Sequence, residues 1–418
     1  MNRWLLRRSE NREFNYLGST LLALLSNLFT ILIQIVAGRS LFLVQFSAFL
    51  TAWAIYSLIA LATSGIQTTS AIQVAKSEGW KSELALDDLP KFGFDPFTKR
   101  LLNLAIVLTV IALLFTPIFS QLLQIQSPLY ILSCIAIVPQ VLFAIAVGRI
   151  QGRYEFIIMN AFGAASTFSR LVATSFVLKF SPTAESIMIA NIAVTFAFAI
   201  YGLAKQKMNI VSLSNFSLWD AGRTTTILLV FWAVFNLDMF VSRLSPKGEY
   251  YESYAAASSL ARTVLLPVVL LTAALVPKLA SGLKTNFGGT RWQVLMHFFN
   301  LILASFVALF LWIFSKNLTE LLLGETNSEV EYLLHMLSVA YLPYAVIYSL
   351  VNKRIALGAR VNLSLIAIPA IIGISLFLAL ELPITSLPPV IFIIGIMIVG
   401  SMYLQNKFQS RISRLFER

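Results

Sequence analysis

Two arginines lie inside long apolar segments of this 418-residue chain, and their chemistry is the first indication of what it binds. Arg170 follows the run FGAASTFS, and Arg262 follows the run YAAASSLA. A guanidinium is always charged, and its planar fork binds phosphate or carboxylate through two parallel hydrogen bonds. In apolar surroundings such a charge is costly, and by default it faces a cavity or a partner. Salt-bridged packing and an anionic ligand are the two interpretations of both arginines.

Small and polar residues share a helix face with Arg170. Asn160, Gly163, Thr167 and Thr174 lie three or four residues apart in register with it. This spacing places all of them along one side of a helix. We expect Asn160, Thr167 and Arg170 to contribute to a substrate-binding surface.

A second polar row lies in the first apolar segment. Thr20, Asn27 and Gln34 repeat every seven residues, which again places them on one helix face. They are candidates for substrate contacts, or for hydrogen bonds between neighbouring helices.

Asn236 and Asp238 lie just before the end of another apolar segment and are further candidate binding residues. Asp238 is only five residues from Arg243. It is therefore either an acid at the membrane surface or a buried partner of Arg262, and the sequence leaves both interpretations open. Even if it is buried, two arginines with one acid leave a positive charge that an anionic substrate would offset.

Several kinds of site find no support in the sequence. One cysteine, Cys134, excludes a disulfide framework and a cysteine-based metal site. His297 and His335 are far apart, which argues against a histidine metal centre. There is no G-x-x-x-x-G-K-[ST] motif and no nucleophile motif. We expect no catalytic residues, no metal and no cofactor, with an H+ or Na+ gradient as an open choice for driving motion.

The composition identifies an integral membrane protein. The chain is 58% hydrophobic and 12% charged, whereas soluble domains carry about 25% charged residues. Apolar segments close to the roughly 20 residues that cross a bilayer recur along its whole length. They predict twelve helices, near residues 16–38, 45–72, 101–119, 128–148, 155–178, 184–204, 224–242, 252–276, 294–315, 332–351, 361–380 and 386–405.

The net charge of +12 is mostly an orientation signal rather than a sign of nucleic-acid binding. Of the 31 Lys and Arg residues, 24 fall at the termini and in alternate loops, and two lie within spans. The opposite loops hold five, which are Arg39, Lys179, Arg243, Lys247 and Lys316. Because basic loops stay on the cytoplasmic side, both termini are expected in the cytoplasm. The arginines at 170 and 262 then lie at similar depth, about 13 and 15 Å below the outer surface.

The two halves of the chain repeat each other at a shift near 204 residues. Pro139 and Pro343 lie within the fourth and tenth spans, and Arg149-Ile150 matches Arg354-Ile355. Six spans per half make the repeats parallel, an architecture typical of transporters. The predicted fold is all-α, with six-helix bundles at 1–208 and 209–418. Prolines break helix interiors, so Pro139, Pro267 and Pro343 are candidate hinges.

Three stretches of the chain carry motifs of a known kind. Residues 38–67 contain Gly38-Arg39-Ser40-Leu41 and Phe46-Ser47-Ala48-Phe49, residues 236–279 end in Pro277-Lys278-Leu279, and residues 148–152 read GRIQG. In this order they resemble the first hairpin, the seventh and eighth helices, and the turn after the fourth helix of polysaccharide-biosynthesis flippases of the O-antigen type, in the multidrug/oligosaccharidyl-lipid/polysaccharide (MOP) exporter superfamily. The chain departs from the pattern at Gln45 and Ser253, where the family has glycine.

The resemblance implies a fold of two six-helix bundles in a V around a cationic central cavity. It implies alternating access that moves a polyprenyl-diphosphate-linked oligosaccharide, a repeat unit of O-antigen, capsule or exopolysaccharide, to the outer leaflet of the cell membrane. The expected partners are this substrate, membrane lipids, and a polysaccharide polymerase with glycosyltransferases; nucleic acid is not expected.

Two rival functions remain open from the sequence. A MATE-type ion-coupled multidrug exporter would be expected to use buried carboxylates, and Asp238 is the one acid placed within a span. A membrane polymerase or glycosyltransferase of the same pathway would be expected to carry a large outer loop. The longest outer loop, near 316–331, is short.

Overall fold

The computed structural model shows a chain built of helices. It describes residues 2–68, 70–71, 74, 96–153, 155–205, 218–244, 250–269, 271–272, 290–356 and 361–416. Within these ranges every regular element is a helix, which confirms the all-α prediction. Lipid offers no partner for backbone N–H and C=O groups, so an apolar chain crosses it as hydrogen-bonded helices.

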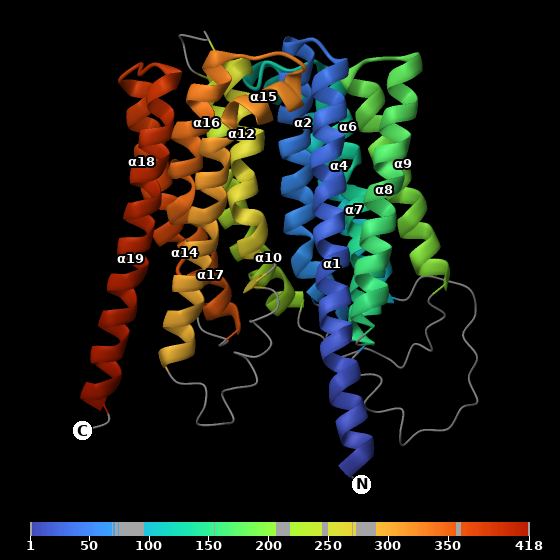
Figure 1. Ribbon diagram of the computed structural model, residues 1–418, viewed down its shortest axis with the longest axis vertical. Helices are drawn as coiled ribbons and strands as arrows, with labels where there is room; N and C mark the ends of the chain where they lie inside the picture. The colour runs from blue at the N-terminus through green and yellow to red at the C-terminus, as the bar shows by residue number, and fades with distance from the viewer. Residues whose placement is uncertain are drawn as a thin grey trace. The chain divides into compact units, whose positions relative to one another are not determined.

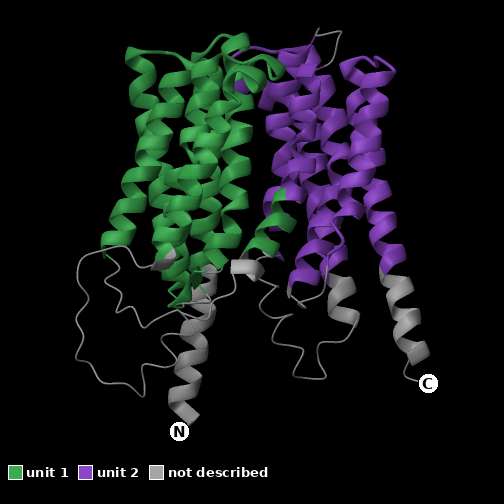
Figure 2. Cartoon of the chain, turned by 180° about the vertical axis from the view of Figure 1, so that it is seen from behind, with its two compact units in different colours: residues 1–229 green, residues 230–418 purple. Residues whose placement is uncertain are grey.

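The described helices form two compact units, Met1–Leu229 and Val230–Arg418 (Figure 2). The boundary predicted between residues 208 and 209 lies outside the described residues and stays a prediction. The same is true of the motif Pro277-Lys278-Leu279 and of most of the basic loop residues near 75–95 and 278–289.

The first unit is a bundle in which α1 packs lengthwise along α8, and α7 and α9 pack against each other (Figure 1). Its helices are α1 (Asn2–Ser40), α2 (Leu43–Ala62), α4 (Pro96–Leu114), α5 (Thr116–Leu122), α6 (Ser127–Ile135), α7 (Ile137–Gly152), α8 (Phe156–Phe180) and α9 (Ala184–Lys205). Along α2, the rings of Phe46, Phe49, Trp53 and Tyr56 contact one another in sequence. This buried row fixes the position of the Tyr56 hydroxyl at its end.

The second unit begins within α10 (Leu218–Phe235), and α16 packs against α12, α14 and α19. Its remaining elements are α11 (Leu237–Leu244), α12 (Tyr251–Ala261), the 3-10 turn η1 (Arg262–Leu265), α14 (Thr290–Ile313), α15 (Ser315–Leu323), α16 (Ser328–Ala340), α17 (Leu342–Ala356), α18 (Ser364–Ala379), the 3-10 turn η2 (Ile384–Ser386) and α19 (Leu387–Phe416).

Eight helices of the described chain are long and apolar enough to cross a membrane, or ten if each of two bent pairs counts as one span. These ten coincide with ten of the twelve predicted spans. For the span predicted at 361–380 the structure has the shorter apolar helix Ser364–Ala379. The span predicted at 252–276 corresponds to α12 and η1 and is described only in part.

Each predicted hinge proline lies just after a break in a helix rather than in an uninterrupted interior. Pro139 cannot donate to the carbonyl of Ile135, where α6 ends, and Pro343 cannot donate to Val339, at the end of α16. Pro267 likewise cannot donate to the carbonyl of Thr263 within η1. The N–H of Leu266 donates to this carbonyl instead. The prolines therefore set where the helices break, while hinge motion stays a prediction.

The predicted repeat is visible in the positions of these breaks. The third helix of each half is interrupted at a phenylalanine, Phe115 before α5 and Phe314 before α15. The fourth is interrupted at Ala136 in the first half and at Tyr341 in the second. Matching interruptions in the same order in both units support duplication of a six-helix repeat.

The segment 148–152, predicted as a turn, is instead the last turn of α7. Its glycines allow close packing on residues 67–74, which follow α2. A Cβ on Gly148 would lie 2.3 Å from the carbonyl oxygen of Gln67, and one on Gly152 would lie 2.5 Å from that of Ala71.

Replacing Gly148 by alanine should therefore lower the melting temperature of the detergent-purified protein. The methyl group overlaps backbone, and overpacking of this kind typically costs about 1–3 kcal/mol. Gly400→Ala in α19 is the matched control, because a Cβ there meets no atom within 4 Å. Equal melting temperatures for the two variants would contradict the close contact.

Candidate functional site

Arg170 lies midway along α8 and is half-buried, and its partners among the described residues are neutral side chains of the first unit. Its Nη1 donates to the hydroxyl of Tyr56 at 3.3 Å. Its Nη2 donates to Oγ1 of Thr167, one helical turn earlier, at 3.0 Å. The predicted polar stripe thus does place Thr167 beside Arg170.

Both acceptors belong to a longer chain of hydrogen bonds. The Tyr56 hydroxyl bonds to Thr195 Oγ1 at 2.8 Å, and Thr195 donates to the backbone carbonyl of Asn191. On the other side, Thr167 Oγ1 bonds to Ser26 Oγ at 2.9 Å. We call Ser26, Tyr56, Thr167, Arg170, Asn191 and Thr195 the Arg170 network. It connects α1, α2, α8 and α9.

The positive charge of Arg170 is not neutralised within the described part of the chain. No described carboxylate forms an ion pair with it, and its Nε is buried without a hydrogen-bond partner. Asn191 is fully buried, and its Oδ1 also has no partner. Hydroxyl dipoles alone solvate this guanidinium, which leaves it able to bind an anion.

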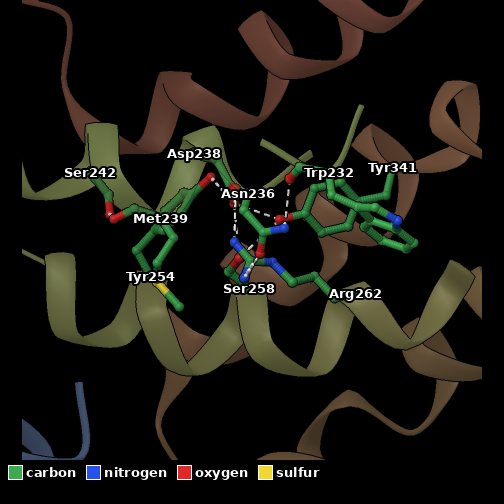
Figure 3. Close-up of polar contacts among 9 residues, drawn as sticks. All are labelled: Trp232, Asn236, Asp238, Met239, Ser242, Tyr254, Ser258, Arg262 and Tyr341. Atoms are coloured by element: carbon green, nitrogen blue, oxygen red, sulfur yellow. Dashed lines mark hydrogen bonds and ion pairs between the residues drawn. The ribbon is translucent and has the colours of Figure 1, made fainter. Parts of the chain in front are cut away.

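Arg262 is in a different position, because it forms an ion pair (Figure 3). Its Nη2 lies 2.9 Å from Oδ1 of Asp238, and its Nη1 donates to Oδ1 of Asn236 at 2.7 Å. Asp238 is 2% exposed. Asp238 is therefore the buried partner of Arg262, and its interpretation as an acid at the membrane surface is wrong.

The other oxygen of Asp238 is also fully engaged. Oδ2 accepts hydrogen bonds from Ser258 at 2.8 Å, from Tyr341 at 2.5 Å and from Tyr254 at 3.2 Å. One arginine and three hydroxyls satisfy the carboxylate, as a buried charge requires. We call Asn236, Asp238, Tyr254, Ser258, Arg262 and Tyr341 the Asp238 cluster.

The remaining predicted residues lie on or near α1. Asn160 donates to Ser19 Oγ at 2.5 Å and so helps to hold α8 against α1. Asn27 and Gln34 directly follow Ser26 and Ile33 along α1, and both are half-buried. Neither forms a hydrogen bond with any residue that the structure describes. Substrate contact stays a prediction for Asn27 and Gln34. Neither forms a hydrogen bond to a neighbouring helix within the described part of the chain.

Sequence reasoning missed the hydroxyls that position both arginines, above all Tyr56, Thr195 and Tyr341. Each is one hydroxyl among several polar groups in a predicted span, and no spacing rule links it to an arginine on another helix. One signal was available for Tyr341: it lies two residues before Pro343, where a helix break was to be expected.

A double-mutant cycle should show that Asp238 and Arg262 depend on each other. Removing one partner leaves a buried charge unpaired, so Asp238→Ala and Arg262→Ala should each lower the unfolding free energy by about 3–5 kcal/mol. The double variant should lose clearly less than the sum, as measured by denaturation in detergent. Strict additivity would show that the pair does not interact.

Comparison with known proteins shows the fold. No protein-family profile and no curated protein sequence matches the chain. Among solved structures, the eukaryotic MATE transporter AtDTX14 aligns with a TM-score of 0.70 at 15% identity, covering 95% of both chains. The lipid II flippase MurJ, in an inward closed conformation, aligns at 0.66 and 14% identity, covering 93% of this chain and 87% of its own. A multidrug resistance MATE transporter of the MOP superfamily aligns at 0.65 and 13% identity, covering 96% of this chain and 99% of its own.

These identities are low, so the similarity concerns the backbone rather than the site residues. The chain has the helical fold found in MATE transporters and in a lipid II flippase.

Proposed function

We propose that this protein is a flippase that moves a polyprenyl-diphosphate-linked oligosaccharide from the cytoplasmic to the outer leaflet of the cell membrane. The observation that carries the proposal is the state of Arg170. It is a guanidinium inside a membrane-spanning helix whose only described partners are neutral hydroxyls. An intramembrane charge without a counter-ion marks a site for a charged ligand.

A diphosphate fits the donors that Arg170 has left. A guanidinium carries five N–H groups, and Tyr56 and Thr167 accept from two of them. The second N–H of each Nη group remains and suits the bidentate hydrogen bonding of a phosphate group, whereas the partnerless Nε is buried.

Polar groups on α1, which packs along α8, suit a sugar. Asn27 and Gln34 on α1 are half-buried amides with no partner among the described residues. Gly163, two turns before Arg170 on α8, has open space beside it, since a Cβ there would meet no atom within 4 Å. Amides can both donate to and accept from sugar hydroxyls.

The polyprenyl tail would stay in the bilayer, which the outward faces of the helices allow. Large apolar side chains are exposed along α4 and α14, for example Val107 at 53% and Phe306 at 67%. Such faces contact lipid in a membrane-spanning bundle, so a tail can move beside the protein while the head group passes through it.

The alternative functions fit less well. A drug exporter that binds organic cations needs an available buried carboxylate, but Asp238 is saturated by Arg262 and three hydroxyls. A polymerase or glycosyltransferase needs a domain outside the membrane, but the loop predicted at 316–331 is the short helix α15 and the start of α16.

The proposal includes cytoplasmic termini, coupling to an H+ or Na+ gradient, and work alongside a polymerase and glycosyltransferases. The basic loops and the chemistry of the cargo support these parts. Genes for such enzymes beside this one would strengthen the proposal.

The role of the Arg170 charge in flipping can be tested in proteoliposomes that contain a fluorescent polyprenyl-diphosphate oligosaccharide. Arg170→Ala should slow flipping about ten- to a hundredfold, because a hydrogen bond to a charged group contributes about 1.5–3 kcal/mol. Arg170→Lys should be slowed less, since it keeps the charge but loses the fork. Lys179→Ala, an exposed position on the same helix, is the matched control. Wild-type flipping by Arg170→Ala would refute the proposal.

The open space at Gly163 gives a test that leaves every charge in place. Gly163→Trp should block flipping with little change in melting temperature, because the indole enters free space rather than packed atoms. Gly163→Ala should flip normally and be slightly more stable, as alanine favours helix by about 1 kcal/mol over glycine. Normal flipping by the tryptophan variant would place the substrate path elsewhere.

A further inference from the structure

Three helix breaks of the second unit meet at one carboxylate (Figure 3). Asn236 separates α10 from α11, which are bent by 44°. Arg262 is the residue at which α12 passes into the 3-10 turn η1. Tyr341 separates α16 from α17.

The side chain of each break residue is linked to Asp238 by hydrogen bonds, either directly or through Arg262. Tyr341 donates to Oδ2, Arg262 donates to Oδ1, and Asn236 is tied indirectly because it accepts from Arg262. Residues separated by 103 positions in the chain thus depend on one buried carboxylate.

Breaks are the points at which these helices can change direction. The ladder of backbone hydrogen bonds is interrupted there, so side chains decide the angle. At Asn236 the side-chain amide donates to the carbonyl of Trp232 at 2.7 Å and so holds the end of α10. The Asp238 cluster therefore holds three adjustable joints in one arrangement.

The two charged partners differ in accessibility. The side chain of Arg262 is 16% exposed, whereas that of Asp238 is 2% exposed. The guanidinium uses one N–H for Asn236 and one for Asp238, and its Nε has no partner. Arg262 is therefore the more accessible partner for an incoming anion, and each of its Nη groups has a second N–H to offer, whereas its Nε is buried.

We propose that Asp238 acts as a latch, which means that its hydrogen bonds hold the three breaks in one arrangement. An anion that binds to Arg262 breaks these bonds and releases the latch. The anion draws the guanidinium away from Asp238 and Asn236, so the joints at Asn236, Arg262 and Tyr341 loosen together. The identity of the anion as a lipid diphosphate rests on the proposed function, whereas the latch itself does not.

Hydrogen–deuterium exchange of the full-length protein in lipid nanodiscs tests the latch without substrate. Asp238→Asn should raise exchange about tenfold or more in the peptides around residues 236, 262 and 341 together, because each loses a bond to a charged group. Ser242→Ala is the control, since this buried hydroxyl on α11 bonds only to the carbonyl of Met239 in its own helix. Faster exchange around residue 236 alone, or equally throughout the second unit, would overturn the proposal.

Tyr341→Phe provides a milder variant that keeps the ring packed against Phe235 and Tyr344. It should raise exchange most around residue 341 and measurably around 236 and 262. A rise confined to residue 341 would show that the three joints are independent.

The release step is tested by adding polyprenyl diphosphate to the nanodisc, with the uncharged polyprenol as control. The diphosphate should raise exchange at all three breaks of the wild type and add nothing in Asp238→Asn. Unchanged exchange in a protein that still flips the diphosphate would overturn the release step and leave the proposed function intact. Loss of flipping by Arg170→Ala bears on the proposed function alone.

Discussion

A guanidinium inside a membrane must have polar partners, and the arrangement of polar side chains in both units follows from this constraint. Its desolvation must be offset by an anion or by many hydrogen bonds. The second unit supplies an anion, because Asp238 pairs with Arg262 and is itself satisfied by three hydroxyls. The first unit supplies hydroxyls only, through Tyr56 and Thr167. Arg262 is therefore paired within the protein, whereas the described residues provide no counter-ion for Arg170.

The two arginines also order the helices around them. The Arg170 network reaches α1, α2, α8 and α9, so the position of Arg170 and the packing of the first unit depend on the same hydrogen bonds. In the second unit, Pro267 and Pro343 each remove a backbone hydrogen bond to the residue four positions earlier. Asp238 is the group on which three helix breaks converge, those at Asn236, Arg262 and Tyr341.

The backbone resembles both MATE transporters and a lipid II flippase at identities of 13–15%. At that distance the similarity shows the fold, and the pairing of the buried charges has to be read from this chain itself. In this chain the two arginines have different partners, a carboxylate for Arg262 and hydroxyls for Arg170.

The sequence by itself determined the membrane class, the helices, the repeat and the two arginines, because these depend on local composition and on spacing along one chain. Ten of the twelve predicted spans coincide with candidate spans, and the stripe from Asn160 to Thr174 does carry the contacts of α8. Only the tertiary structure decided that Asp238 is buried against Arg262 and that Tyr56 and Tyr341 hold the two sites. Those pairings join residues 24 to 114 positions apart on different helices. Apolar side chains of many kinds can fill the space between two helices, so the pattern along the chain does not specify which polar group meets which across it.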